Sequence, residues 1–361
     1  MEKYYLAALQ MVGGIGSVSI HKLTDFFGSA EQAWQASRND LSLCGGFHEK
    51  VCNNLIKHRE KIDVHKLAAD WDKKGIKICT LNEKEYPSLL RNIYNPPIIL
   101  YYRGILPDSE RLLAIVGARR ASVYGKNTAR MFAAELADQG FGVVSGGARG
   151  IDTAAHQGAI TKGKTIAVMG SGVDIVYPQE NRKLFDTITE SGAVLSEYPP
   201  GTPAHPAFFP ARNRLISGLS LGTLIVEAAE KSGALITADF ALEQNRDVFA
   251  IPGSIFSELS KGSHQLIKQG AKLVQNVNDI LEEYGFSPHE HQSEDNRLTN
   301  DETAVYSVLT HDSPISIDEI VMKTNLTSSI VTYILLQLEL RGLVAGQSGQ
   351  RYVRAAREGI R

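Results

Sequence analysis

Short apolar runs separated by amphipathic stretches dominate the middle of this chain. The first run, Arg111–Val116, reads RLLAIV, and the others lie at Val143–Val144, Thr165–Met169, Ala193–Ser196, Thr223–Val226 and Val248–Ile251. Short buried strands that alternate with amphipathic helices are typical of a parallel sheet covered by helices on both faces. The pattern therefore predicts an α/β protein whose core, at residues 81–286, is a Rossmann-like parallel sheet.

Residues 1–80 are expected to form a separate helical domain. LQMVGGIG at residues 9–16 and LSLCGGF at residues 41–47 repeat weakly, and a helical pattern follows each. Each unit reads helix, glycine turn, helix, as in a helix-hairpin-helix or SAM-like bundle. In helix-hairpin-helix modules the turn amides and the next helix N-terminus accept a DNA phosphate. A plain helical bundle without DNA contact fits the same pattern, because the proline usual before Gly-Ile-Gly is absent.

The C-terminal part is expected to be a linker followed by a winged helix. Residues 287–300 are polar and partly acidic, and residues 301–361 read helix, helix, helix, strand, turn, strand. Ser316 begins a capping-box pattern, and Thr327 or Ser328 caps a third helix that ends at Gly342. Base-reading helices usually carry several polar or basic contacts, but Arg341 is the only cation of this helix. An accessory or partner-binding role is therefore favoured over sequence-specific duplex binding.

Composition excludes several classes of protein. No run approaches the roughly 18 apolar residues that cross a membrane, so no membrane partner is expected. The N-terminus does not resemble a signal peptide. Cys44, Cys52 and Cys79 contain no C-x-x-C pair, which argues against a disulfide framework or zinc knuckle and fits a cytoplasmic location. The net charge is −2, so any nucleic-acid binding must depend on locally gathered positive charge.

Four loops that follow predicted strands or helices have the residues of a phosphate-binding site. Ligands of an open parallel sheet bind beyond the carboxyl ends of the strands, so these loops should converge. They read VGARR (116–120), SGGARGID (145–152), GSGVD (170–174) and FPARNR (209–214). Small residues at a strand-to-helix turn direct free N–H groups at an anion, and arginine binds two phosphate oxygens at once.

The glycine spacing argues against a dinucleotide site. Such a site needs G-x-G-x-x-G after the first strand and an acidic residue about 20 positions later. Here VGAR has one glycine, GSG lacks the third, and no P-loop motif is present. Arginines on successive loops suit an extended polyanion better than one pyrophosphate. The alternative is that some of them make internal salt bridges with Asp152, Glu197 or Glu227.

These motifs together resemble the DNA-processing protein A (DprA/Smf) family. The matching segments are SGGARGID, GSGVDIVYP, SEYPPGTP, FPARNR, and VEA followed by SGALITA. Two loops depart from the usual Val-Gly-Ser-Arg and Ser-Gly-Leu-Ala, with Ala118 and Gly147 at the altered positions. KGSH at residues 261–264 stands where the family often has Lys/Arg-Gly-Thr/Cys-Asn.

The resemblance implies a single-stranded-DNA-binding protein that protects incoming DNA and loads the RecA recombinase during natural transformation and recombination. It implies a homodimer and no catalytic residue, cofactor or metal. The implied DNA-binding residues are Gly117, Arg119, Ser145, Gly146, Arg149, Gly150, Gly170, Gly172, Lys183, Arg212, Asn213 and Arg214. An apolar cluster that includes Ile267 and Leu273 is either core or the self-association face.

An enzymatic alternative depends on the same region. His156 lies one helical turn after Asp152, so the two side chains could form an acid–base pair or bind a metal. No third ligand stands at metal spacing, and we favour Asp152 as a helix cap and His156 as a packed residue. The alternative function is a Rossmann-like nucleotide-binding enzyme or sensor that uses the same pocket.

Overall fold

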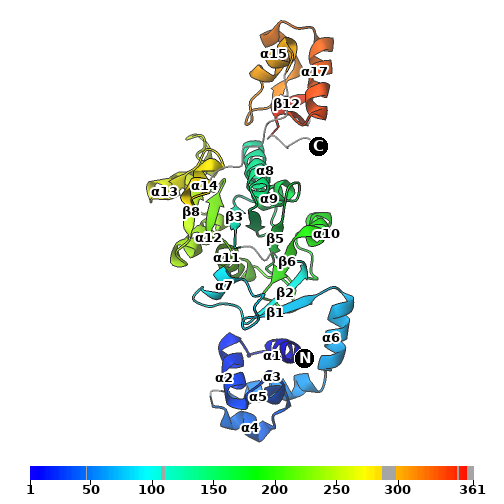
Figure 1. The fold of residues 1–361 in the computed structure, drawn as a ribbon, viewed down its shortest axis with the longest axis vertical. Coiled ribbons are helices and arrows are strands. Elements are labelled where there is room, and N and C mark those ends of the chain that lie inside the picture. The colour runs from blue at the N-terminus through cyan, green and yellow to red at the C-terminus, as the bar shows by residue number, and fades with distance from the viewer. Residues whose placement is uncertain (46, 107–109, 287–297, 348, 356–361) are drawn as a thin grey trace.

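The computed structural model describes residues 1–45, 47–106, 110–286, 298–347 and 349–355. Figure 1 shows the N-terminal helices at one end, a sheet with helices on both faces in the middle, and a small helical and stranded unit at the other end. The α/β fold with a helical N-terminal part and a C-terminal winged helix is thereby confirmed. Among the described residues, no helix is long and apolar enough to span a bilayer.

The N-terminal part is a bundle of six helices. Their bounds are α1 Glu2–Gln10, α2 Ser17–Phe27, α3 Ala30–Gln35, α4 Arg38–Leu43, α5 Glu49–Arg59 and α6 Val64–Lys73. Two helix–turn–helix pairs, α1–α2 and α4–α5, match the weak sequence repeat. The Asn54 amide of α5 donates to the Gly13 carbonyl at 3.0 Å, so the first glycine turn is held against the second pair. Trp34 of α3 is buried between them.

The central sheet has nine strands in the order β1-β2-β6-β5-β4-β3-β7-β8-β9. The strands are β1 Lys77–Thr80, β2 Ile99–Gly104, β3 Leu112–Val116, β4 Gly142–Ser145, β5 Thr165–Val168, β6 Ala193–Ser196, β7 Gly222–Ile225, β8 Asp247–Ala250 and β9 Lys272–Leu273. The six predicted strands are confirmed, and their pairings are parallel. The sequence did not predict β1 and β2, which pair antiparallel at one edge. The expected boundary at residue 81 therefore falls after the first strand of the sheet.

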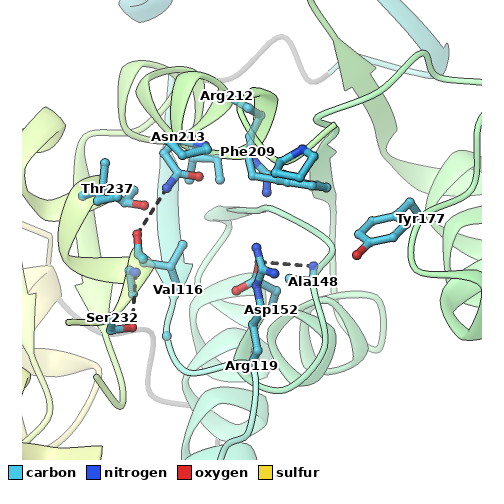
Figure 2. A pocket seen from close by; sticks show the side chains of 17 residues that line it. Val116, Arg119, Ala148, Asp152, Tyr177, Phe209, Arg212, Asn213, Ser232 and Thr237 are labelled. Carbon is cyan, nitrogen blue, oxygen red and sulfur yellow. Dashed lines mark hydrogen bonds between the residues drawn. The ribbon is translucent and has the colours of Figure 1, made fainter. Parts of the chain in front are cut away.

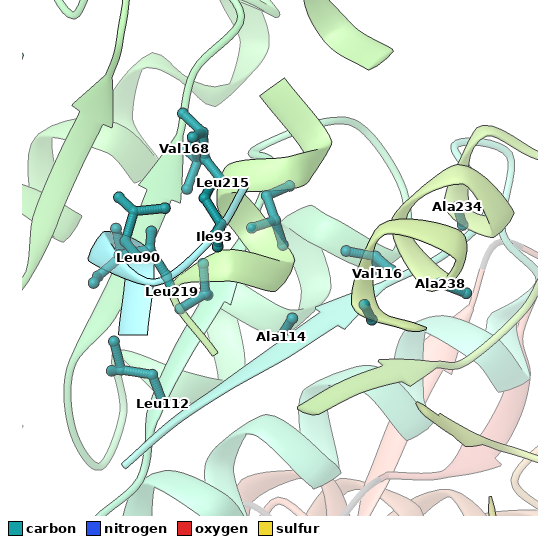
Figure 3. Close-up of a cluster of buried hydrophobic side chains, with 14 of the residues drawn as sticks. Leu90, Ile93, Leu112, Ala114, Val116, Val168, Leu215, Leu219, Ala234 and Ala238 are labelled. Carbon is teal, nitrogen blue, oxygen red and sulfur yellow. The ribbon is translucent and has the colours of Figure 1, made fainter. Parts of the chain in front are cut away.

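Both faces of the sheet are buried because its strands are apolar at successive positions. Along β3, Leu112, Ala114 and Val116 face one layer, while Leu113 and Ile115 face the other. The first layer contains α7 Ser88–Arg91, α11 Phe208–Gly218, α12 Gly233–Glu243 and α13 Lys261–Lys268 (Figure 3). The second contains α8 Val123–Asp138, α9 Ile151–Ala159, α10 Arg182–Ser191 and α14 Asn278–Glu283.

The winged helix follows the predicted order of elements. It contains α15 Asn300–Val308, β10 Ile315–Ser316, α16 Ile317–Thr324, α17 Ser328–Leu340, β11 Val344–Gln347 and β12 Arg351–Arg354. The Ser316 capping box is confirmed, and Thr327 caps α17. Most of the predicted linker lies outside the described residues. Its end was set too late, since Thr299 already caps α15.

Candidate nucleic-acid interface

A pocket of about 390 Å³ opens at the carboxyl ends of the parallel strands. The strand order reverses at β3, which pairs with β4 on one side and β7 on the other. The crevice outside such a switch point is where ligands of open α/β sheets bind. Figure 2 shows that side chains from the loop after β3, from α9, from α11 and from the start of α12 surround the pocket. The predicted loops after β3 and β4 therefore converge here as expected. The FPARNR segment also reaches the pocket, but it lies within helix α11 and is not a loop, and no residue of GSGVD (170–174) lines the pocket.

Arg119 is the exposed cation of this pocket. Its guanidinium carbon lies 5.4 Å from the centroid of the Phe209 ring, a cation–π contact. No carboxylate among the described residues forms an ion pair with it. Gly117, two residues earlier, also lines the pocket. A Cβ on Gly117 would lie 2.6 Å from the Ile151 side chain, so this glycine also permits close packing of α9.

Glu227 fills the place that a pyrophosphate takes in many nucleotide-binding relatives of this fold. In those proteins the phosphates sit at the N-terminus of the helix after the first strand. Here the buried Glu227 carboxylate accepts hydrogen bonds from the Ser122 amide at 2.9 Å and from the Ser122 hydroxyl, at the start of α8. A Cβ on Gly125 would lie 2.3 Å from this carboxylate. The protein therefore supplies its own anion at this helix.

The loop after β4 is organised in the same way, around Asp152. The amides of Gly146 and Ala148 each donate to one Asp152 oxygen at 3.2 Å. Asp152 does not cap α9, because the cap position is Gly150, with φ of +79° and no side-chain bond. The expectation that these amides are free for an anion was wrong. Burial raises the pKa of Asp152, and the charge of Arg212 opposes that shift.

Arg212 is buried and braces two loops. Its side chain is 4% exposed, and Nη1 donates to the carbonyls of Gly146 at 2.7 Å and of Val168. Burial lowers its pKa to about 10, so it stays charged at neutral pH. A cation placed in this way holds the loops after β4 and β5 together. Arg212 lines the pocket as expected, but its Nη1 is already engaged with these two carbonyls of the protein.

Several other expected site residues lie inside the protein. Ser145 is fully buried and donates to the Ile115 carbonyl at 2.7 Å. A Cβ on Gly170 would lie 2.9 Å from the Phe209 ring, and one on Gly172 would lie 2.8 Å from the Pro199 carbonyl oxygen. These glycines permit close approach of protein segments beneath the pocket.

The remaining basic candidates occupy three different settings. Arg149 is exposed and forms a two-pronged ion pair with Glu180, in which Nη2 and Oε2 are 2.9 Å apart. The Arg214 side chain is 18% exposed and pairs with Glu197, one of the internal bridges considered from the sequence. Lys183 is exposed on α10, away from the pocket lining. Asn213 does line the pocket and donates to the Gly233 carbonyl at 3.3 Å.

His156 takes no part in the pocket. Its Nδ1 lies 2.7 Å from the Thr165 hydroxyl oxygen, which itself donates to the Val143 carbonyl. The hydroxyl proton is thereby used, so Nδ1 carries the proton of the ring. Burial lowers the pKa of His156 to about 3. Among the described residues no group of His, Cys, Asp and Glu is arranged to hold a metal ion.

Aromatic and neutral residues complete the lining, and the sequence had not singled them out. Tyr177 is 46% exposed, and its ring centroid lies 5.3 Å from that of Phe209. On the other side Ser232, Ile236 and Thr237 belong to the start of α12. Phe209 and Tyr177 belong to the motifs FPARNR and GSGVDIVYP. The sequence alone does not indicate that these two rings, which are far apart along the chain, pack together.

Models of two protein families match this chain. The model of DNA recombination-mediator protein A matches residues 77–285. The model of the DprA winged helix domain matches residues 289–350. Together they cover the sheet and the C-terminal unit in the order in which the structure has them.

Similar proteins and structures agree with these matches. Protein Smf of Synechocystis sp. is 35% identical over 98% of this chain and 99% of its own length. DNA processing protein DprA of Bacillus subtilis is 42% identical over 60% of this chain and 74% of its own. The crystal structure of DprA from Streptococcus pneumoniae superposes with a TM-score of 0.66 and 36% identity, covering 80% of this chain and 99% of that one. DNA processing protein A from Helicobacter pylori, solved for its single-stranded DNA binding mode, gives 0.53 and 32%, over 58% and 95%.

Proposed function

The chain belongs to the DNA recombination-mediator protein A family, and from this premise we propose that its pocket binds single-stranded DNA. The observation that carries the proposal is the pairing of an exposed arginine with two aromatic rings. Arg119, Phe209 and Tyr177 line one side of the same pocket. Proteins that bind single-stranded DNA without sequence preference use two elements. Cationic side chains contact the phosphates of the DNA backbone, and aromatic rings stack against the bases.

The alternative of an enzyme or sensor for a free nucleotide receives less support. A compact phosphate group is commonly bound by the amides of a glycine loop and a helix N-terminus. In this chain Glu227 and Asp152 accept hydrogen bonds from the amides at those positions. Phosphate binding is then left to side chains, above all to Arg119. We propose no catalytic step.

We further propose a wider role in recombination. A single strand held in this pocket would be protected and passed to RecA, as the family resemblance implies for natural transformation, in the cytoplasm and as a homodimer. The DNA contacts would come from Gly117, Arg119 and Asn213 in the pocket, from Arg149 in the small hollow beside it, and from Lys183 on the neighbouring helix α10, outside the pocket lining. Ser145, Gly146, Gly150, Gly170, Gly172, Arg212 and Arg214 would keep these positions in place.

Replacing Arg119 tests the proposed site. Loss of a charge-assisted contact of about 1.5–3 kcal/mol predicts that Arg119→Ala weakens binding to a dT oligomer about tenfold or more. The slope of log affinity against log salt should fall by about 0.7 for each lost phosphate contact. Fluorescence anisotropy at several salt concentrations measures both, and circular dichroism checks the fold.

The neighbouring exposed Arg120, which does not line the pocket, provides the matched control Arg120→Ala. Equal affinity of both variants and the wild type would place the DNA elsewhere. A titration with thymidine monophosphate tests the alternative of an enzyme or sensor for a free nucleotide. That alternative requires the mononucleotide to bind more tightly than the oligomer. Arg212→Ala should behave differently from Arg119→Ala, because removing one partner of a buried charge network costs about 3 kcal/mol of folding stability.

A further inference from the structure

Two arginines flank a small hollow beside the main pocket. Arg119, Arg149, Tyr177, Pro178, Phe209 and Arg212 line it, together with Gly146 and Ala148. Arg119 and Arg149 are the exposed cations of this lining. They differ in one respect: Arg119 forms no ion pair with a carboxylate among the described residues, and only its charge interacts with that of Asp152, whereas Arg149 is directly paired with Glu180.

The contact between Arg149 and Glu180 has the geometry of phosphate binding. Nε and Nη2 of Arg149 face the two carboxylate oxygens of Glu180, the second pair at 2.9 Å. A guanidinium presents this same two-pronged edge to the oxygens of a phosphate. The two side chains are 66% and 51% exposed, and Arg149 lines the hollow, so a ligand there can reach its guanidinium. The hydrogen bonds between them raise the pKa of Arg149 and lower that of Glu180, which keeps both charged at neutral pH.

The position of Glu180 is fixed by its neighbour in the sequence. Asn181 is buried, and its amide donates to the Gly147 carbonyl at 3.0 Å and to the Thr153 hydroxyl at 2.8 Å. Gly147 belongs to the loop that carries Arg149, and Thr153 lies in the first turn of α9, the helix that follows this loop. The turn that presents Glu180 is therefore fastened to the segment that presents Arg149.

We propose that Glu180 is a built-in competitor of the DNA backbone, which holds Arg149 in the free protein and releases it only to a strand that enters the hollow. This inference rests on the proposed function of the same pocket and names its regulation. A single phosphate at Arg119 leaves the Arg149–Glu180 pair intact. A strand whose next phosphate reaches Arg149 replaces the carboxylate, so the pair disfavours short ligands.

The magnitude is modest and measurable. Exposed ion pairs are weak, so Glu180→Gln should tighten binding to a dT oligomer only about 1.5- to 5-fold. In the wild type, the Glu180 carboxylate that the strand displaces remains beside the DNA and retains a cation, which offsets the cation released from the phosphate that Arg149 binds. The variant should therefore steepen the dependence of log affinity on log salt by about 0.7. A purely structural role for Glu180 would not change this slope in that direction.

Glu258→Gln is the matched control. Glu258 forms another exposed bridge, with Lys261, outside both pocket linings, and its replacement changes the net charge equally. We expect Glu258→Gln to retain the wild-type affinity and salt slope. If Glu180→Gln and Glu258→Gln behave alike, or if Glu180→Gln weakens binding, Glu180 does not compete with DNA.

A double-mutant cycle provides the second measurement. If Glu180 masks Arg149, Arg149→Ala costs little affinity in the wild type and several-fold more in the Glu180→Gln background. Equal costs in both backgrounds overturn the inference. If the pocket does not bind DNA at all, Arg119→Ala leaves the affinity for the dT oligomer unchanged, and the proposed function itself fails. A loss of affinity in Arg119→Ala together with an unchanged Glu180→Gln removes this inference alone.

Discussion

Carboxylates decide which groups of this pocket remain available to a ligand. Glu227 and Asp152 accept backbone amides, Glu197 pairs with Arg214, and Glu180 pairs with Arg149. Each contact satisfies a donor that the bare motif would offer to a phosphate. Arg119 is the exposed cation of the pocket lining: it lies over the Phe209 ring and forms no ion pair with a carboxylate among the described residues, although its charge interacts with that of Asp152.

The sequence identified the residue types of the site more reliably than their accessibility. Arg119 and Arg212 both lie in prominent motifs that contain small or aromatic residues. The sequence alone does not indicate which of the two arginines is more accessible to a ligand. Their difference arises from packing: Arg212 lies on the inner side of α11 and is 4% exposed, whereas Arg119 ends an exposed loop. The salt bridge of Arg214 to Glu197 was one of the alternatives foreseen, but the partner of Arg149 was not.

His156 makes the stability of the folded chain depend on pH. Its pKa of about 3 keeps it neutral in the folded state, while the unfolded chain takes up a proton below about pH 6.5. The folded state therefore loses stability as pH falls below that value, by about 1.4 kcal/mol at pH 5.5. Urea unfolding at pH 7.5 and 5.5 measures the loss. His156→Gln should be less stable at pH 7.5 but lose less on acidification, whereas a variant of the exposed His21 should keep the wild-type difference.

Elements of regular pattern were predicted closely, and short ones were missed. The six apolar runs became strands, and the capping box at Ser316 begins α16 as expected. β9 escaped because it has two residues, and β2 because it follows the prolines of Asn95-Pro-Pro97, which suggest a turn. β1 is as long as the predicted β4, but it lies at the edge of the sheet and pairs with β2 alone. Edge strands of this kind are defined by their pairing partners, which periodicity cannot reveal.

Helix α17 presents an apolar face where a DNA-reading winged helix would present cations. Ile330, Tyr333, Leu336 and Leu340 are 40%, 63%, 52% and 73% exposed, and the helix contains no Lys or Arg. On the wing, Arg354 is engaged with the carbonyls of Tyr306 and Ser307. The element lacks the phosphate contacts that dominate affinity for DNA. This agrees with the accessory role expected from the sequence.

Placing negative charge on α17 tests this assignment. Tyr333→Asp combined with Leu336→Asp should leave affinity for both single-stranded and duplex oligomers within about twofold of the wild type at low salt. Two carboxylates inserted into a groove would repel the phosphates strongly. Anisotropy with matched single-stranded and duplex probes decides the question. A loss of duplex binding alone would mean that α17 enters the major groove.

At the scale of the whole molecule, the sheet ends in a short exposed edge. β9 is the last strand, and its Leu273 is 43% exposed while Leu266 and Val274 are buried. Ile267, expected with Leu273 at a self-association face, packs partly against the core between the sheet and α13. The cluster therefore contains both core and surface residues. Leu273 is thus the exposed member of this pair, and the self-association face that we propose depends on it.

The homodimer that we propose is best tested at Leu273. Two-residue strands with a lysine offer little backbone for pairing, so a dimer at this edge would depend on side-chain burial. Leu273→Lys would place a charge in that interface and should shift the mass from light scattering toward one chain, whereas charging Ile267 would also destabilise the core. Leu43→Lys, on an exposed leucine at the end of α4, is the matched control and should retain the wild-type mass. If the Leu273→Lys protein remains dimeric at every concentration, the self-association face lies elsewhere on the molecule. If the wild type is monomeric at every concentration, the proposal of a homodimer is wrong.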